Sequence, residues 1–156
     1  MKKKVLFVCI HNSARSQIAE ELLRKYASDH FDVESAGFEV SDINPLAIET
    51  LQEEGIDISN KKTNSVFEFF KQGKLFNYVI TVCDEGNAQR CPLFPGLNNR
   101  IHWSFEDPKT FEGSAEEKLQ KIGVVKEKIR TEVLKLIELV RSNQLKENVP
   151  NNWKVS

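Results

Sequence analysis

Two spacings of apolar residues alternate along the chain. Short runs rich in apolar residues are typical of strands in a parallel sheet that is covered on both faces. Between these runs, apolar residues recur every three or four positions, which is typical of helices packed on such a sheet. The pattern therefore predicts strands at residues 4–8, 31–35, 78–82 and 100–103, and helices at residues 16–28, 44–55, 66–70 and 114–141.

The alternation of strands and helices predicts an α/β fold with a doubly wound parallel sheet and right-handed crossovers. The sequence has no internal repeat or linker, so we expect residues 1–142 to form one domain and the polar residues 143–156 to form a C-terminal tail. In such a sheet the active site lies at the carboxyl ends of the strands. Cys9, Cys83 and Asp107 each follow a predicted strand and are expected to meet there.

The segment after the first strand has the pattern of an oxyanion site. Cys9 ends the strand, and Arg15 comes six positions later, where a helical pattern begins. Loop N–H groups and a helix N-terminus can cradle an anion, and Arg15 can bind two of its oxygens. The same positive field favours the Cys9 thiolate, which is the form that attacks. Ser13 and Ser16 add hydroxyl donors, and Ser16 is also a candidate N-cap.

This segment has two alternative interpretations. One is a buried cysteine at a strand end beside a solvated arginine. The other is a nucleotide-binding P-loop, which is excluded because its glycines and lysine are missing.

Two further cysteines, Cys83 and Cys91, flank a polar segment that contains Gly86 and Asn87. These two residues make the segment easy to unwind. Thiol–disulfide exchange needs sulfurs that approach to bonding distance and later separate, so a cysteine pair on a mobile loop suits redox chemistry. The alternative is a pair of ordinary buried cysteines near a loop.

Asp107 precedes Pro108 after the fourth predicted strand. A carboxyl group above an anion site can donate a proton to a departing hydroxide or alkoxide. The alternative is an aspartate that caps a turn before the proline.

Composition narrows the class of protein. The chain has 156 residues, a formal net charge of −1 and three cysteines. The charge gives no basic field for nucleic acid or an anionic membrane surface, so neither is expected as a partner. The apolar run after Lys2-Lys3-Lys4 is too short for a signal peptide and no stretch is long enough to span a bilayer, which predicts a cytoplasmic protein. An odd number of cysteines argues against a disulfide framework. The spacing of Cys83 and Cys91 is too wide for a typical zinc pair.

The motifs taken together resemble the thioredoxin-coupled arsenate reductases, which share the low-molecular-weight protein tyrosine phosphatase fold. The first motif is common to both groups, whereas the Cys83/Cys91 pair is found in the reductases. The matching residues follow in order along the chain: 9–20, Ser35-Ala36-Gly37, Asn44-Pro45, Asp57-Ile58-Ser59, Thr81-Val82-Cys83-Asp84, Cys91-Pro92 and Asp107-Pro108.

The resemblance implies a four-stranded sheet in flavodoxin-like order and a mechanism. Cys9 attacks bound arsenate while Asp107 protonates the leaving hydroxide; Cys83 then attacks Cys9, and arsenite leaves. Cys91 attacks Cys83, and thioredoxin reduces the resulting disulfide. Arg15 and Ser16 complete the catalytic set. The residues implied to hold the oxyanion, with phosphate or sulfate as mimics of arsenate, are Ile10, His11, Asn12, Ser13, Ala14 and Arg15.

Some relatives bind a monovalent cation near the loop, and Asn12, Glu20 and Ser35 match that site. Asn64 stands where an acidic residue would strengthen it. No other cofactor is implied, and a monomer is expected. In the loop itself, His11 replaces the glycine of many relatives.

A phosphatase that forms a phosphocysteine is the main alternative function, because Cys9, Arg15 and Asp107 would serve it equally. Against it, Lys109 stands where tyrosine phosphatases typically carry an aromatic residue. A non-catalytic oxyanion sensor is the third possibility.

Overall fold

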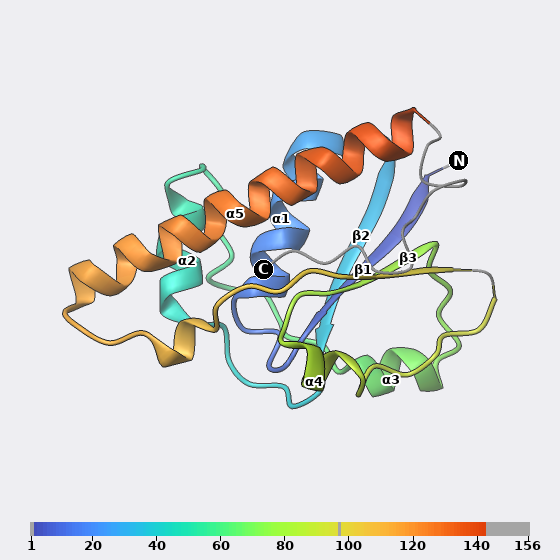
Figure 1. Cartoon of the computed structure of the whole chain (residues 1–156), viewed down its shortest axis with the longest axis horizontal. Helices are drawn as coiled ribbons and strands as arrows, with labels where there is room; N and C mark the ends of the chain where they lie inside the picture. The colour runs from blue at the N-terminus through green and yellow to red at the C-terminus, as the bar shows by residue number, and fades with distance from the viewer. Residues whose placement is uncertain (1, 97, 143–156) are drawn as a thin grey trace.

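The computed structural model describes residues 2–96 and 98–142, and a parallel sheet of four strands lies at its centre (Figure 1). The strand order is β2-β1-β3-β4, and every neighbouring pair is parallel, so the predicted fold class is confirmed. β1 is shielded from solvent on both faces, which explains its continuous apolar sequence. The strands are β1 (Lys3–Cys9), β2 (Phe31–Gly37), β3 (Tyr78–Thr81) and β4 (Asn99–His102).

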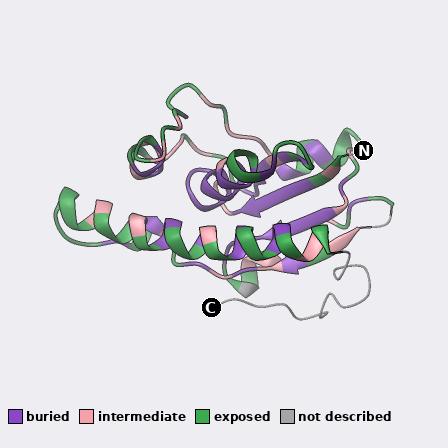
Figure 2. Ribbon diagram, turned by 90° about the horizontal axis from the view of Figure 1, so that it is seen from above, coloured by how far each residue is buried: buried purple, intermediate pink, exposed green. Residues whose placement is uncertain are grey.

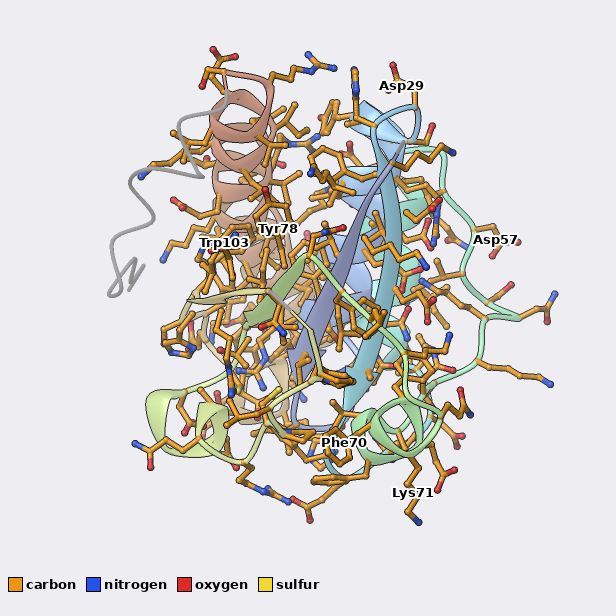
Figure 3. All side chains as sticks on the ribbon, turned by 90° about the vertical axis from the view of Figure 1, so that its right-hand side faces the viewer. Asp29, Asp57, Phe70, Lys71, Tyr78 and Trp103 are labelled. Atoms are coloured by element: carbon orange, nitrogen blue, oxygen red, sulfur yellow. The ribbon has the colours of Figure 1, made fainter. Side chains whose placement is uncertain are left out.

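Helices cover the sheet and one of its ends. α1 and α5 pack against each other, and α5 crosses the whole molecule with a buried inner side and an exposed outer side (Figures 1 and 2). α3 lies beyond the carboxyl ends of the strands, where Figure 3 labels its Phe70 and Lys71. The helices are α1 (Arg15–Ala27), α2 (Pro45–Gln52), α3 (Val66–Lys71), α4 (Glu85–Ala88) and α5 (Ala115–Arg141).

Three details differ from the sequence prediction. The sequence predicts a mobile loop between Cys83 and Cys91, whereas the structure has one helical turn there, α4, which Asp84 caps by accepting the N–H of Asn87 at 2.9 Å. A short 3₁₀ helix, Pro108–Thr110, was not predicted. Ser16 does not cap α1, because the helix begins one residue earlier and Ala14 takes the cap position without a side-chain bond.

The predicted tail, residues 143–156, lies outside the described residues. Within residues 2–96 and 98–142, no helix has the length and apolarity needed to cross a membrane.

Ion pairs centred on Glu54 connect α1, α5 and the end of α2. Glu54, just after α2, contacts Lys25 at 3.0 Å, Lys126 at 3.2 Å and Arg130 at 2.6 Å. The hydrogen bond from Arg130 is the main cause that lowers the pKa of Glu54 from 4.5 to about 2. Since the pKa is lower in the folded protein than in the unfolded chain, the charged carboxylate stabilises the fold above about pH 4.5. That stabilisation is lost as the pH falls toward 2.

We therefore expect Glu54→Gln to lower the free energy of unfolding by about 1–2 kcal/mol at pH 7, and by much less near pH 2.5. Urea unfolding at both pH values measures this difference. The control is Glu68→Gln, whose exposed partner Lys71 is 3.6 Å away and which should cost less than about 0.5 kcal/mol. An equal loss at both pH values would show that the charge is not the cause.

Candidate active site

The loop between β1 and α1 turns its carbonyl oxygens outward. Four of these carbonyls accept backbone N–H groups from the segment that follows β2. The pairs are residue 9 with 38 at 3.3 Å, 10 with 39 at 2.8 Å, 11 with 41 at 3.2 Å, and 13 with 44 at 2.9 Å. The carbonyls of Asn12 and Ala14 accept bonds from the Gln17 side chain and the Ile18 N–H. In a trans peptide the C=O and the next N–H point in opposite directions. The N–H groups of residues 10–15 therefore face the inside of the loop, as in an anion-binding nest.

Asn12 holds this loop in shape. Its φ of 56° lies in the left-handed region, which asparagine tolerates better than most residues. Its side-chain nitrogen donates to Ser16 Oγ at 2.8 Å and to Ser35 Oγ at 2.9 Å. Its side-chain oxygen accepts from the Asn64 N–H at 2.8 Å and from Gln17 Nε2 at 3.1 Å. All hydrogen-bonding groups of the Asn12 side chain thus have partners that hold the loop of residues 9–15, called the cradle below, in its conformation.

Cys9 lies at the base of the cradle and is 2% exposed. Its sulfur is 2.8 Å from Ser16 Oγ and accepts the Asn12 N–H at 3.2 Å. Because Ser16 Oγ already accepts from Asn12, its own proton is available to the sulfur. The Ser16 hydroxyl can therefore donate to the Cys9 sulfur, and it does not cap α1, whose N-cap is Ala14.

Arg15 and Asp107 meet beside the loop. The Arg15 guanidinium is buried, donates to the Phe105 carbonyl at 3.1 Å and lies 3.6 Å from the Asp107 carboxylate. The other Asp107 oxygen accepts the N–H of Lys109 at 3.0 Å and caps the 3₁₀ turn. Both sequence interpretations of Asp107 are thus compatible with its position: it caps the start of a turn and also lies next to the Arg15 guanidinium.

Cys83 comes two residues after the end of β3, the strand that pairs with β1, and is fully buried. Burial raises the pKa of Cys83 to about 12, the Arg15 charge opposes this rise, and the charge of Cys9 adds to it. β3 is the parallel neighbour of β1, so the segments that carry Cys9 and Cys83 leave the sheet at the same edge, in agreement with these interactions. The structure therefore brings together Cys9, Arg15, Cys83 and Asp107 at the carboxyl ends of the strands, as the sequence predicted.

Cys91 lies in a different environment. It follows α4 and lines a cavity of about 480 Å³ beside β4, together with Leu93 and Arg100. The thiol is 5% exposed, and burial raises its pKa to about 11. The preceding residue, Arg90, forms an ion pair in which its guanidinium lies 3.0 Å from the Glu39 carboxylate. All three cysteines are free thiols.

The residues expected to hold a monovalent cation are near one another but already have partners. Glu20 accepts the Ser35 hydroxyl at 2.5 Å, and its other oxygen lies 2.6 Å from Arg24 and 2.7 Å from Lys61. Asn12, as described above, has no oxygen capacity left. A guanidinium and an ammonium thus supply the positive charge here, and this arrangement does not fit an additional cation.

Sequence reasoning missed two contributors to the cradle. Gln17 is fully buried although it is polar, and it bonds the Asn12 carbonyl and side chain. Lys61 reaches Glu20 from a loop 41 residues further on. The spacing of apolar residues does not indicate either residue, because both act through polar contacts that this spacing does not report.

Comparison with known proteins agrees with this geometry. The family model for the low molecular weight phosphotyrosine protein phosphatases matches residues 4–151. An arsenate reductase of Halalkalibacterium halodurans is 41% identical over 117 residues, which cover 75% of this chain and 82% of that protein.

Two solved structures are also similar. An arsenate reductase in its phosphate-binding state has a TM-score of 0.70 and 30% identity, covering 87% of this chain and 97% of the other. A thioredoxin-dependent arsenate reductase of Corynebacterium glutamicum has a TM-score of 0.64 and 31% identity, covering 94% of this chain and 63% of that chain. The chain therefore belongs to the low molecular weight phosphotyrosine protein phosphatase family.

Proposed function

We propose that this protein reduces arsenate to arsenite with Cys9, Cys83 and Cys91, and that thioredoxin restores the thiols. The observation that carries the proposal is the position of Cys83, a second thiol buried beside the nucleophile and its arginine. Phosphoester hydrolysis has no use for a thiol at this place. The arsenate reductases that match the chain across most of its length support the same activity.

Binding comes first. Arsenate is a tetrahedral oxyanion, and phosphate and sulfate have the same shape. The inward N–H groups of residues 10–15 and the buried Arg15 guanidinium supply the donors. An anion held by these donors would lie over the Cys9 sulfur, which is at the base of the loop and accepts the Asn12 N–H, so the thiolate would be placed to attack its central atom.

Reduction takes two thiol steps. The Cys9 thiolate bonds to arsenic, and hydroxide leaves with a proton for which Asp107 is the candidate donor. Cys83 then attacks the Cys9 sulfur, and the electron pair of the sulfur–arsenic bond remains on arsenic. The two thiols are oxidised to a disulfide while arsenic(V) becomes arsenic(III) and departs as arsenite.

A third step moves the disulfide. Cys91 attacks Cys83, Cys9 leaves as a thiolate, and the Cys83–Cys91 disulfide is passed to reduced thioredoxin. Cys91 lines the cavity beside β4, and Cys83 is not among the residues that line it. The two sulfurs must approach to bonding distance in this step, so we expect the α4 segment between them to change conformation. A reducing cytoplasm and a monomeric enzyme suit this cycle.

One equivalent of arsenate should remove two thiols per chain, and peptide mass mapping should find them at Cys83 and Cys91. In Cys91→Ser the reaction should stop at the Cys9–Cys83 disulfide. The Cys83→Ser variant should form no disulfide and lose thioredoxin-linked turnover. Retained turnover in either variant would overturn the proposal.

The phosphatase alternative predicts a different result. In that case the Cys83→Ser/Cys91→Ser double variant would hydrolyse phosphoesters efficiently through a phosphocysteine, and arsenate would leave the thiol count of the unaltered protein unchanged.

A further inference from the structure

We propose that Arg100 is a positioning residue for the second thiol exchange, where it holds Cys91 in place and stabilises its thiolate. This role rests on the three-thiol reduction proposed above. It concerns a residue outside the cradle, on the edge strand of the sheet.

The first support is geometric. Arg100 lies in β4, and its Nη2 donates to the Cys91 carbonyl oxygen at 3.2 Å. Both residues line the cavity of about 480 Å³ beside that strand. The hydrogen bond ties the backbone of Cys91 to a strand of the rigid sheet, although Cys91 itself follows the short α4 helix.

The second support is electrostatic. Burial raises the pKa of Cys91 to about 11, and the positive charge of Arg100 acts in the opposite direction. His102, which lines the same cavity, has its Nδ1 2.7 Å from Thr81 Oγ1.

The neighbouring arginine is turned to other partners. Arg90 contacts the Glu39 carboxylate at 3.0 Å, donates to the Asn87 side chain at 3.0 Å, and lies 5.0 Å from the centre of the Phe38 ring. Its charge is therefore engaged with Glu39, whereas Arg100 donates to the Cys91 carbonyl and its charge acts on the Cys91 thiol.

The chemistry explains why a cation is needed at this place. Cys91 must be a thiolate to attack the Cys83 sulfur of the Cys9–Cys83 disulfide. The Cys91–Cys83 bond forms, the Cys83–Cys9 bond breaks, and the electron pair leaves on Cys9. Arg100 is itself exposed, but its bond to the Cys91 carbonyl keeps the guanidinium next to this residue, and a positive charge there raises the small population of thiolate.

The test uses Cys91 as the single remaining thiol. The chain has three cysteines, so the Cys9→Ser/Cys83→Ser variant reports the alkylation of Cys91 by iodoacetamide as a function of pH. Adding Arg100→Gln should shift the midpoint upward by about one pH unit and slow alkylation at neutral pH about tenfold. Arg100→Lys, which keeps the charge, should restore most of the rate. An unchanged profile in Arg100→Gln would overturn the inference.

A second measurement follows the exchange itself in the protein with all three thiols. After one equivalent of arsenate, Arg100→Gln should accumulate the Cys9–Cys83 disulfide at the normal rate and convert it to Cys83–Cys91 about tenfold more slowly. Arg141→Gln, an exposed arginine at the end of α5, is the control and should behave like the unaltered protein. If arsenate forms no disulfide at all, the proposed function fails, while the alkylation profile still decides the electrostatic role of Arg100.

Discussion

Arg15→Lys is expected to lower kcat/KM for arsenate reduction by about 10³-fold, or about 4 kcal/mol of transition-state stabilisation. Lysine keeps the positive charge but not the planar fork that binds two oxyanion oxygens. It also cannot reproduce both contacts of the buried guanidinium, the bond to the Phe105 carbonyl and the approach to Asp107. The loss should appear in kcat as well as in KM, because charge on the oxyanion changes as the thiolate attacks.

Steady-state kinetics with thioredoxin recycling, together with calorimetric titration of phosphate, separate binding from chemistry in this variant. Arg141→Lys is the matched control, since it makes the same substitution at an exposed position in the last turn of α5. A fall of less than tenfold in kcat/KM would mean that charge alone, and not the geometry of the fork, holds the anion.

The sheet and the cradle could be predicted from the sequence because their signals are local. The run from Val5 to Val8 has strand character at every position, and the cysteine and arginine follow at a spacing that a strand-to-helix turn imposes. The convergence of Cys9, Cys83 and Asp107 follows from topology alone, because parallel strands share one carboxyl edge.

The parts that could not be predicted depend on contacts between distant segments. Nothing near Glu20 indicates that Lys61 will neutralise it, and nothing near Cys91 indicates that Arg100 will bind its carbonyl. α4 was missed because Gly86 favours a loop, whereas the Asp84 cap offsets that preference over a single turn. Segments this short have too few residues for periodicity to decide their structure.

Gly37→Ala is expected to lower the free energy of unfolding by about 2–3 kcal/mol and kcat by about 10²-fold. Gly37 ends β2 and pairs with Cys9, so its α-carbon lies against the back of the cradle. A β-carbon there would be 2.6 Å from the Asn12 nitrogen and 2.8 Å from the Ile10 oxygen. Both atoms are backbone, so the loop must shift as a unit, and the inward N–H groups would no longer converge on the anion. Urea unfolding, phosphate affinity and kcat should therefore all change together.

Gly123→Ala is the control for this substitution, and its effect should have the opposite sign. Gly123 lies inside α5, and a β-carbon there would meet nothing within 4 Å. Alanine should therefore stabilise the protein by about 0.5–1 kcal/mol through helix propensity and leave kcat unchanged. If Gly37→Ala kept full activity with normal stability, the close approach of β2 would not be what fixes the loop. The catalytic geometry would then depend on the Asn12 hydrogen bonds alone.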